Sequence, residues 1–326
     1  MTATDTLVHD ELGAAPASRK ARWGDPIFKA VTLGAGIFTV TIMFAIGLFL
    51  LIRALPALAN NSGNFLTSST WLPDQSPPVF GIAALLFGTL VTASLALLMA
   101  VPVGVAVALY ASHYATPRLG KVLAFLVDLL AAVPSIIFGL WGLAVLMPNM
   151  GGLLKWLNDH LGFIPIFQNT TGIYTKSVLI AAVVLAIMIL PTVSSVSREV
   201  LVQAPDLQIE AALAVGATKW ESMRMVVLPF GRPGIISAAM LGLGRALGET
   251  IAVAIILSAL FEVNWHISEP GGNTFAANIA LKWNEAGTNG LGALIASGLV
   301  LFLITLAVNL VARMVINRRR VKEGTA

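Results

Sequence analysis

Residues 177–197 read SVLIAAVVLAIMILPTVSSVS and contain no charged side chain. An α-helix rises about 1.5 Å per residue, so roughly 20 apolar residues cross the hydrocarbon core of a bilayer. This stretch therefore predicts a transmembrane helix. A strand of a membrane barrel would instead alternate apolar and polar residues over about ten positions.

Five further stretches are long and mainly apolar, and two of them carry charged residues. They are residues 30–52, 75–117 (with 79–111 as the apolar part), 122–147, 234–261 and 291–312. We therefore expect an all-α membrane protein with six transmembrane helices.

The composition agrees with this fold class. Of the 326 residues, 57% are hydrophobic and 11% are charged, and the mean hydropathy is +0.86. In soluble proteins about a quarter of the residues are charged, so a soluble enzyme and a nucleic-acid binder are excluded as main interpretations. The chain has no cysteine, which excludes a disulfide, a thiol nucleophile and a cysteine–metal site.

The basic residues predict the topology. Of 20 Lys and Arg residues, 15 lie in the two tails and in the connections on their side of the membrane, while four lie on the other side. Short cytoplasmic segments are enriched in Lys and Arg, so both termini are expected in the cytoplasm. The net charge of +4 is then a sign of topology and does not indicate a nucleic-acid partner.

Three regions are expected along the chain. Residues 1–28 form a cytoplasmic, disordered tail, residues 29–317 a transmembrane domain, and residues 318–326 a basic cytoplasmic tail. No G-x-x-x-x-G-K-[ST], H-E-x-x-H or G-x-S-x-G pattern occurs. We therefore expect no enzyme activity, metal or cofactor in this chain.

The connection over residues 204–230 has strong local signals for two short helices. Pro205 and Asp206 suit the first turn of one helix, and Gly216 suits the left-handed position that ends it. Thr218 and Glu221 predict a capping box for the second helix. Pro229 is expected to stop that helix. The pair is interpreted either as a docking element or as amphipathic helices lying on the membrane surface.

The spacing within this connection favours docking, because it resembles the EAA loop of ABC-importer permeases. That family has Ile where this chain has Val226. The matching residues are Glu210, Ala211 and Ala212, then Gly216, then Leu228 and Pro229. The resemblance implies a type I ABC-importer permease architecture in which the first helix couples the permease to a separate ATPase. ATP and Mg²⁺ would then be bound by that ATPase.

Three charged residues fall inside the predicted spans. Arg245 and Glu249 are four residues apart, so we expect them to share one helix face. They are interpreted either as a substrate pathway site, with Arg245 binding an anion, or as a self-neutralising pair that fixes helix packing. Asp128 is expected to reach the membrane interface or to pair with Lys121.

Four other stretches resemble the phosphate permeases of ABC importers. They are residues 133–142, 190–200, 244–253 and 273–286. The resemblance implies a bacterial inner-membrane subunit that forms half of a phosphate pathway. Its partners would be a second, different permease, two ATPase copies and an external phosphate-binding protein. The alternatives are the partner permease itself, a permease for molybdate or sulfate, a secondary anion transporter, or a membrane sensor.

Two segments on the outer side are candidates for the binding-protein surface or an outer gate. They are residues 153–174 and 271–285, and both contain Trp and Asn in amphipathic stretches. A structural cap lying on the membrane is the other interpretation.

Overall fold

The computed structural model describes residues 24–323 and gives side chains for residues 26–314. The described chain falls into two units, one made of helical residues 24–49 and one that begins at Leu50. Within the described residues, six helices are long and apolar enough to cross a membrane, which confirms the predicted number. They cover Pro26–Asn60, Ala83–Tyr114, Ser135–Leu161, Val178–Leu201, Lys219–Leu247 and Thr288–Met314.

Several spans are built from more than one helical element. The elements that form spans are α1 (Gly24–Asn60), α2 (Ala83–Leu109), α4 (Ser135–Trp141), α5 (Met147–Leu161), α6 (Val178–Leu201), α8 (Lys219–Ser222), α9 (Leu228–Leu247) and α12 (Thr288–Glu323). The other helices are α3 (Pro117–Ala131), α7 (Asp206–Ala214), α10 (Ile251–Ile256) and α11 (Phe275–Lys282). Three π-helical segments (Tyr110–Tyr114, Gly142–Leu146, Met223–Val227), a 3-10 turn (Pro165–Phe167) and two strands, β1 (Trp71–Leu72) and β2 (Val79–Phe80), complete the described structure.

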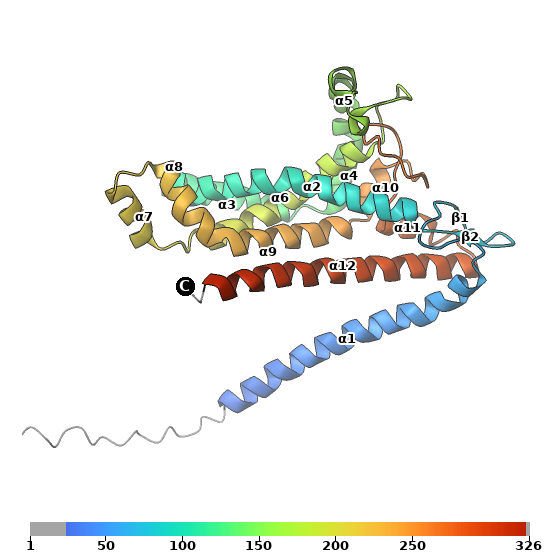
Figure 1. Cartoon of the computed structure of the whole chain (residues 1–326), viewed down its shortest axis with the longest axis horizontal. Coiled ribbons are helices and arrows are strands. Elements are labelled where there is room, and N and C mark those ends of the chain that lie inside the picture. Colours follow the sequence, from blue (N-terminus) through green and yellow to red (C-terminus); the bar gives the residue numbers. More distant parts are fainter. Residues whose placement is uncertain (1–23, 324–326) are drawn as a thin grey trace, which may run out of the picture. The chain divides into compact units, whose positions relative to one another are not determined.

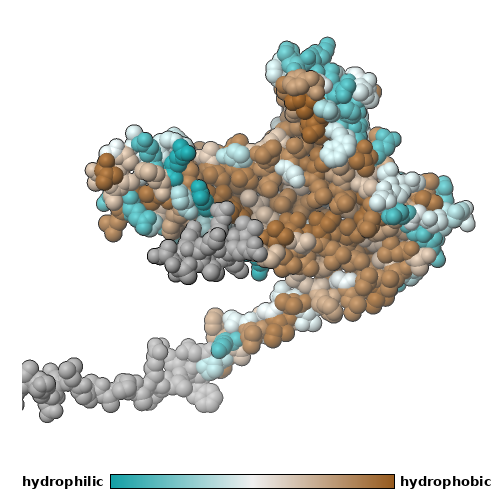
Figure 2. All heavy atoms as spheres, viewed as in Figure 1, coloured by the Kyte–Doolittle hydropathy of each residue, from teal (hydrophilic) through white to brown (hydrophobic). Residues whose placement is uncertain are grey.

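In the second unit, α2, α6, α9 and α12 run side by side (Figure 1). Helices α7 and α8 lie at one end of this bundle, which we call the α7 end, and β1, β2 and α11 lie at the opposite end. Figure 2 shows apolar residues over the middle of the visible face and hydrophilic residues gathered at both ends and around α5. A bilayer requires this distribution of a spanning bundle.

Helix α6 is the central helix of the bundle, and 67% of its membrane window is buried. It approaches α2 closely, because a Cβ added at Gly104 of α2 would lie 3.0 Å from a methyl group of Val193. Small side chains permit such close packing of membrane helices. The largest buried apolar cluster includes five alanines from these two helices, Ala93, Ala96 and Ala100 of α2 and Ala181 and Ala186 of α6.

The prediction of one helix over residues 122–147 is wrong. Helix α3 ends at Ala131 and α4 begins at Ser135, and Pro134 between them has φ −58° and ψ 139°. Proline lacks the N–H that an interior helical position needs, and it restricts the residue before it. The helix long enough to cross the membrane therefore begins after this proline.

The fifth predicted span also differs from the structure. Helix α9 ends at Leu247 and α10 begins at Ile251, so the span is Lys219–Leu247 and not residues 234–261. Pro229 does not stop the helix as predicted. The π-helical segment Met223–Val227 directly before it changes the local hydrogen bonding, and the helix continues through the proline.

Helical structure extends into both predicted tails. Helix α1 begins at Gly24 and α12 continues to Glu323, so residues 24–28 and 318–323 are helical. The remainder of both predicted tails, residues 1–23 and 324–326, lies outside the described residues.

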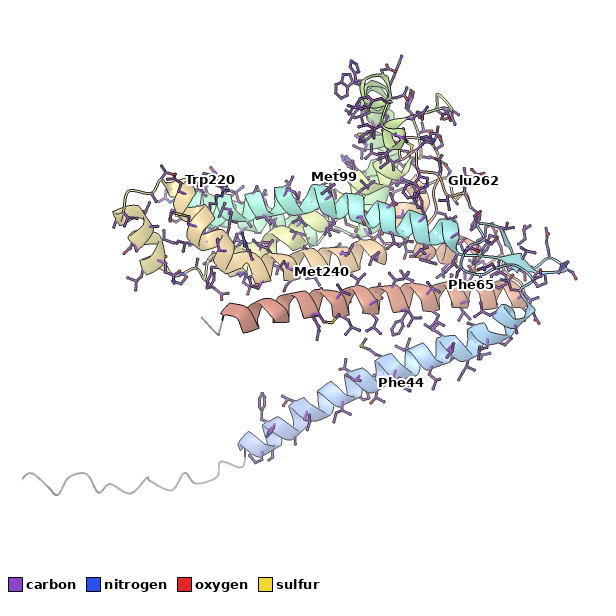
Figure 3. All side chains as sticks on the ribbon, in the orientation of Figure 1. Phe44, Phe65, Met99, Trp220, Met240 and Glu262 are labelled. Atoms are coloured by element: carbon purple, nitrogen blue, oxygen red, sulfur yellow. The ribbon has the colours of Figure 1, made fainter. Side chains whose placement is uncertain are left out.

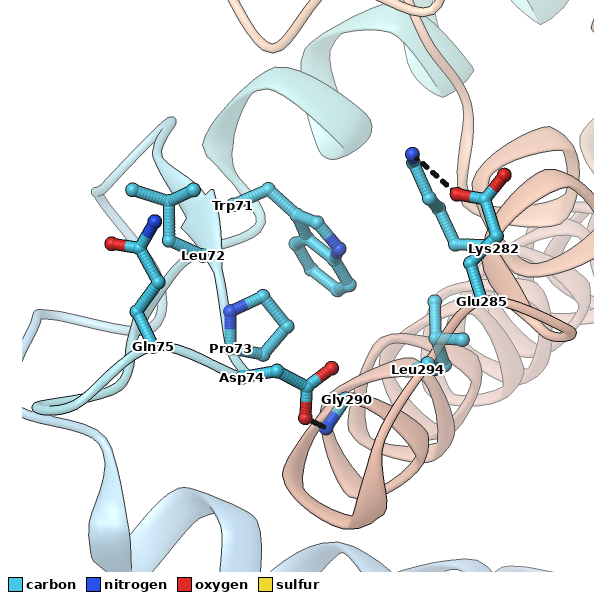
Figure 4. A pocket seen from close by; sticks show the side chains of 10 residues that line it. Trp71, Leu72, Pro73, Asp74, Gln75, Lys282, Glu285, Gly290 and Leu294 are labelled. Atoms are coloured by element: carbon cyan, nitrogen blue, oxygen red, sulfur yellow. Dashed lines mark hydrogen bonds and ion pairs between the residues drawn. The ribbon is translucent and has the colours of Figure 1, made fainter.

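The second strand of the hairpin β1–β2 and part of its turn occupy residues that were predicted to begin the second span. Asp74, in its turn, accepts hydrogen bonds from the backbone N–H groups of Gly287 (2.9 Å) and Gly290 (2.8 Å) at the start of α12 (Figure 4). A carboxylate at a helix N-terminus satisfies free N–H groups and interacts well with the helix dipole. Trp71 and the ion pair of Lys282 with Glu285 line a pocket of about 270 Å³ beside it.

Candidate functional site

Helix α7 presents apolar side chains to its surroundings. Leu207 is 80% exposed and Val215, just after the helix, is 85% exposed. Glu210 and Ala211 are also exposed, while Ala212 is half-buried. A cluster of exposed apolar residues on a projecting element is typical of a protein–protein contact surface.

The local structure predicted for this loop is present. Asp206 is the first residue of α7, and Gly216 has φ +89°, a conformation that residues with a Cβ rarely adopt. Thr218 and Glu221 form the capping box. The Glu221 N–H donates to the Thr218 hydroxyl (3.3 Å), and the Thr218 N–H donates to the Glu221 carboxylate (2.8 Å).

The remaining residues of the EAA pattern lie apart from this exposed surface. Leu228 is half-buried, and together with Ile209 of α7 it packs against an apolar cluster that we call the junction cluster. Pro229 follows in the first turn of α9. The junction cluster consists of Ala108 and Leu109 of α2, Leu201 at the end of α6, Ala204 in the turn that follows, and Met223 and Val227 of the π-helical segment. The predicted coupling residues therefore divide into an exposed group and a group inside the bundle.

Arg245 lies in the last turn of α9 and is half-buried. Its Nη1 atom is 3.4 Å from the hydroxyl of Thr192 on α6 and donates to it. Helix α9 ends at Leu247, before Glu249, so the prediction that Arg245 and Glu249 share one helix face is wrong. Among the described side chains, no ion pair joins them. The helix unwinds between the two residues, and the spacing of four no longer places them together.

Glu249 has a different partner. It is buried, with 9% of its surface exposed, and its carboxylate accepts a hydrogen bond from the N–H of Ala252 at 3.2 Å. Ala252 in turn lies against α4, because a Cβ added at Gly139 would be 2.7 Å from the Ala252 Cα. Glu249 therefore joins the break before α10 to the helix that follows the break at Pro134.

This arrangement leaves the Arg245 guanidinium with donors to spare. A guanidinium carries five N–H donors in a planar fork that matches the oxygen atoms of phosphate or carboxylate. Among the described residues, the Arg245 guanidinium donates one hydrogen bond, and its acceptor is the neutral hydroxyl of Thr192. The site can therefore bind an oxyanion without first breaking an internal ion pair.

Asp128 has a partner other than Lys121. Its carboxylate accepts a hydrogen bond from the hydroxyl of Ser195 on α6 at 3.3 Å, and the described residues contain no ion pair between Asp128 and Lys121. Arg198 lines the same small cavity as Asp128. The predicted pairing with Lys121 is wrong, because a partner on the neighbouring helix α6 is closer.

The first candidate outer segment is tied to a distant loop. Glu269 is buried and accepts hydrogen bonds from the Thr170 N–H (2.6 Å), the Thr170 hydroxyl (2.7 Å) and the Asn264 amide (2.6 Å). Burial alone raises the pKa of this carboxyl. The hydrogen bonds from Thr170 and Asn264 and the nearby His266 outweigh burial, so the pKa lies below its usual value.

The second candidate segment is less exposed than a docking surface requires. Asn273, Phe275 and Asn278 are buried, and the Phe275 N–H donates to the Thr89 hydroxyl of α2 at 3.1 Å. The first half of α11 is therefore part of the core, and only its end near Lys282 is exposed.

Sequence reasoning missed the long-range contacts of three polar residues. Thr192, Asp74 and Glu269 each form a hydrogen bond with a residue at least 53 positions away in the sequence. Thr192 follows Pro191 inside a predicted span. A polar residue at such a position is the one feature of the sequence that could have indicated this contact. The partners of Asp74 and Glu269 have no local signature.

The family described as "Binding-protein-dependent transport system inner membrane component" matches residues 100–321, which is more than half of the chain. The chain belongs to this family. The matched residues include α7, the break at Glu249 and Arg245. Sequence relatives extend the likeness over nearly the whole permease.

Two such relatives are phosphate transport system permease proteins. PstC 2 of Mycobacterium tuberculosis is 46% identical over 302 residues, covering 91% of this chain and 93% of that protein. PstC of Xylella fastidiosa is 38% identical over 329 residues, covering 98% and 99%. Both matched regions include Pro134, Glu249 and the α7 loop.

Solved structures show the same fold. The crystal structure of a bacterial alginate ABC transporter, in complex with an alginate-bound periplasmic protein, contains a chain with a TM-score of 0.58. The two chains are 17% identical, and the match covers 91% of this permease and 98% of the chain of the alginate transporter. A second alginate importer structure gives a TM-score of 0.54. The expected type I ABC-importer permease architecture is thereby confirmed.

Proposed function

We propose that this permease is one of two different membrane subunits of an ATP-driven importer of inorganic phosphate, in the role that PstC has in its relatives. The observation that carries the proposal is the extended likeness to PstC proteins, 46% identical over 91% of the chain. The partners would be a second permease, PstA, two copies of an ATPase, PstB, and an external phosphate-binding protein, PstS. This assignment favours PstC over the PstA-like alternative.

The proposed location is the bacterial inner membrane, with both termini in the cytoplasm. Six spans return the chain to the side on which it began. The excess of Lys and Arg on that side supports the cytoplasm, since basic residues are retained there. The α7 end then faces the cytoplasm and the β1–β2 hairpin faces outward.

Helix α7 would dock on the ATPase. Its exposed Leu207 and Val215 supply apolar contact, and Glu210, Ala211, Ala212 and Gly216 form the pattern that the resemblance assigns to coupling. Leu228 and Pro229 would carry the movement into α9. ATP hydrolysis, with its Mg²⁺, would take place on the partner, so this subunit would perform no chemistry of its own.

Arg245 would bind phosphate in transit. Its spare donors in a half-buried setting support that role. Glu249 would act on the pathway indirectly, because its carboxylate holds the start of α10 in place. The pathway itself would form between this permease and PstA.

Sulfate and molybdate are the competing substrates, because a guanidinium binds all three oxyanions. They are separated by uptake into vesicles that hold the purified complex with ATP inside. Labelled phosphate should accumulate, and a tenfold excess of sulfate or molybdate should leave its rate unchanged. Accumulation of labelled sulfate or molybdate, with no phosphate uptake, would refute the substrate assignment. A secondary anion transporter would instead follow an ion gradient in the absence of ATP.

A further inference from the structure

The π-helical segment Tyr110–Tyr114, which ends the second span, contacts the loop that carries α7 and α8. The ammonium group of Lys219 lies 4.7 Å from the centroid of the Tyr114 ring. Tyr110 stacks on Tyr114, with ring centroids 6.5 Å apart and planes at 7°. A cation within about 6 Å of an aromatic ring is attracted by the negative face of that ring.

The position of Lys219 in its own helix does not account for this contact. Lys219 is the first residue of α8, whose start is fixed by the capping box. A positive charge is unfavourable at a helix N-terminus, where the helix dipole is positive. The Tyr114 ring supplies the favourable partner that α8 itself does not offer.

Helix α7 reaches the same segment from a second point. Asp206, its first residue, attracts His113 electrostatically, and Lys219 repels His113 more weakly. Ile209, one turn later, packs against the junction cluster, which includes Leu109 directly before the segment. Lys219 of α8 therefore contacts the segment directly, and Ile209 of α7 packs against the cluster beside it. Figure 3 shows Trp220, the neighbour of Lys219, at this end of the bundle.

The segment is also joined firmly to α3. A Cβ added at Gly120 of α3 would lie 2.7 Å from the carbonyl oxygen of Ala111, so the two backbones are in direct contact. The Ala115 N–H donates to the Tyr110 carbonyl at 2.8 Å and closes the π-helical turn. A displacement of this segment would therefore move α2 and α3 together.

From these contacts we infer that Lys219 and Tyr114 form a clasp through which movement of the α7–α8 loop reaches α2 and α3. The inference rests on the proposed function, because the ATPase is the source of that movement. Neither residue belongs to the EAA pattern or to the surroundings of Arg245. Both are positioning residues, which act by holding two elements together.

The first test measures uptake per ATP hydrolysed by the reconstituted complex. Lys219→Met removes the charge and keeps the aliphatic stem, and Tyr114→Leu removes the ring. Each should lower the ratio about threefold, the size expected for one exposed cation–π contact, with copurification of the ATPase unchanged. Lys219→Arg and Tyr114→Phe keep a cation and a ring, so they should behave as wild type.

Two controls separate the clasp from general damage. Lys121→Met removes an exposed cation of α3 and should leave the ratio unchanged. The double variant Lys219→Met, Tyr114→Leu should be no worse than the worse single variant, because one contact is lost in all three. An unchanged ratio in both single variants, or additive losses in the double variant, would overturn the inference.

A second readout does not depend on phosphate. The chain has no cysteine, so Arg118→Cys and Ala217→Cys give unique sites for spin labels on either side of the clasp. In the assembled complex, the distribution of distances between the labels should stay the same when a non-hydrolysable ATP analogue is added. The distribution should broaden when Lys219→Met is also present. A shift on nucleotide addition with the clasp intact would overturn the inference. Failure of phosphate uptake alone would overturn only the proposed function.

Discussion

The carboxylate of Glu249 accepts a hydrogen bond from the backbone N–H of Ala252, 3.2 Å away, and thereby caps the short helix α10. Ala252 packs against Gly139 of α4, the helix that begins after the break at Pro134. Two contacts thus connect the buried Glu249, through α10, to α4.

Replacing Glu249 with alanine should loosen α10. Loss of a side-chain acceptor at a helix N-terminus costs about 0.5–2 kcal/mol. Glu249→Gln retains an oxygen that can accept the same hydrogen bond. Hydrogen exchange of the backbone amides over residues 251–256 should be faster in Glu249→Ala and close to wild type in Glu249→Gln. Equal exchange in all three proteins would show that the cap does not stabilise α10.

Two glycines give a matched pair for the contact between α4 and α10. Gly139→Ala places a Cβ 2.7 Å from the Ala252 Cα and should destabilise the protein by about 1–3 kcal/mol, as overpacking does. Gly152→Ala, in α5, has no atom within 4 Å among the described residues and should be neutral or stabilising by up to about 1 kcal/mol. Thermal unfolding of the two purified variants measures the difference. Similar melting temperatures would contradict the close contact.

Arg245→Gln should slow uptake strongly while the complex still assembles. A hydrogen bond to a charged group contributes about 1.5–3 kcal/mol, so loss of the guanidinium should slow uptake at least about tenfold. Thr192→Val removes the hydroxyl that accepts from Arg245 and keeps the charge, so its effect should be smaller. Uptake by Arg245→Gln at a near-normal rate would make Arg245 a structural residue.

The loop held by Glu269 should loosen in acid. The pKa of Glu269 is lower in the folded protein than in the unfolded chain. Its stabilising contribution is therefore complete above the unfolded pKa, about 4.3, and is lost as the pH falls through the lower folded value. Hydrogen exchange at Thr170, corrected for intrinsic rates, should show protection falling below about pH 4.3. Glu269→Gln should remove this pH dependence, and the same dependence in that variant would contradict the assignment.

Much of the fold could be predicted because its causes are local. The six spans follow from apolar length, and the α7–α8 loop follows from signals within a few residues, such as Gly216 and the pair Thr218 and Glu221. The helix breaks could not be predicted in the same way. Pro134 ends one helix, whereas Pro191 lies inside the unbroken helix α6, although both are prolines in apolar surroundings. Packing of neighbouring helices decides between these outcomes, and composition does not record it.

Arg245 and Glu249 could be singled out from the sequence, but their contacts could not. Arg245 and Glu249 were found because charge inside a membrane is costly and rarely accidental. Their separation follows from unwinding at Gly248 and Thr250, and the hydrogen bond of Arg245 to Thr192 depends on the approach of α6 to α9. Both are results of tertiary structure.

The central claim is that this permease carries phosphate inward when a partner hydrolyses ATP. Its most direct test is uptake of labelled phosphate, supplied with the binding protein, into vesicles that hold the purified complex. We predict accumulation with ATP inside, and none when ATP is replaced by ADP. Equal uptake with and without ATP, or no phosphate uptake by an assembled complex that hydrolyses ATP, would contradict the account.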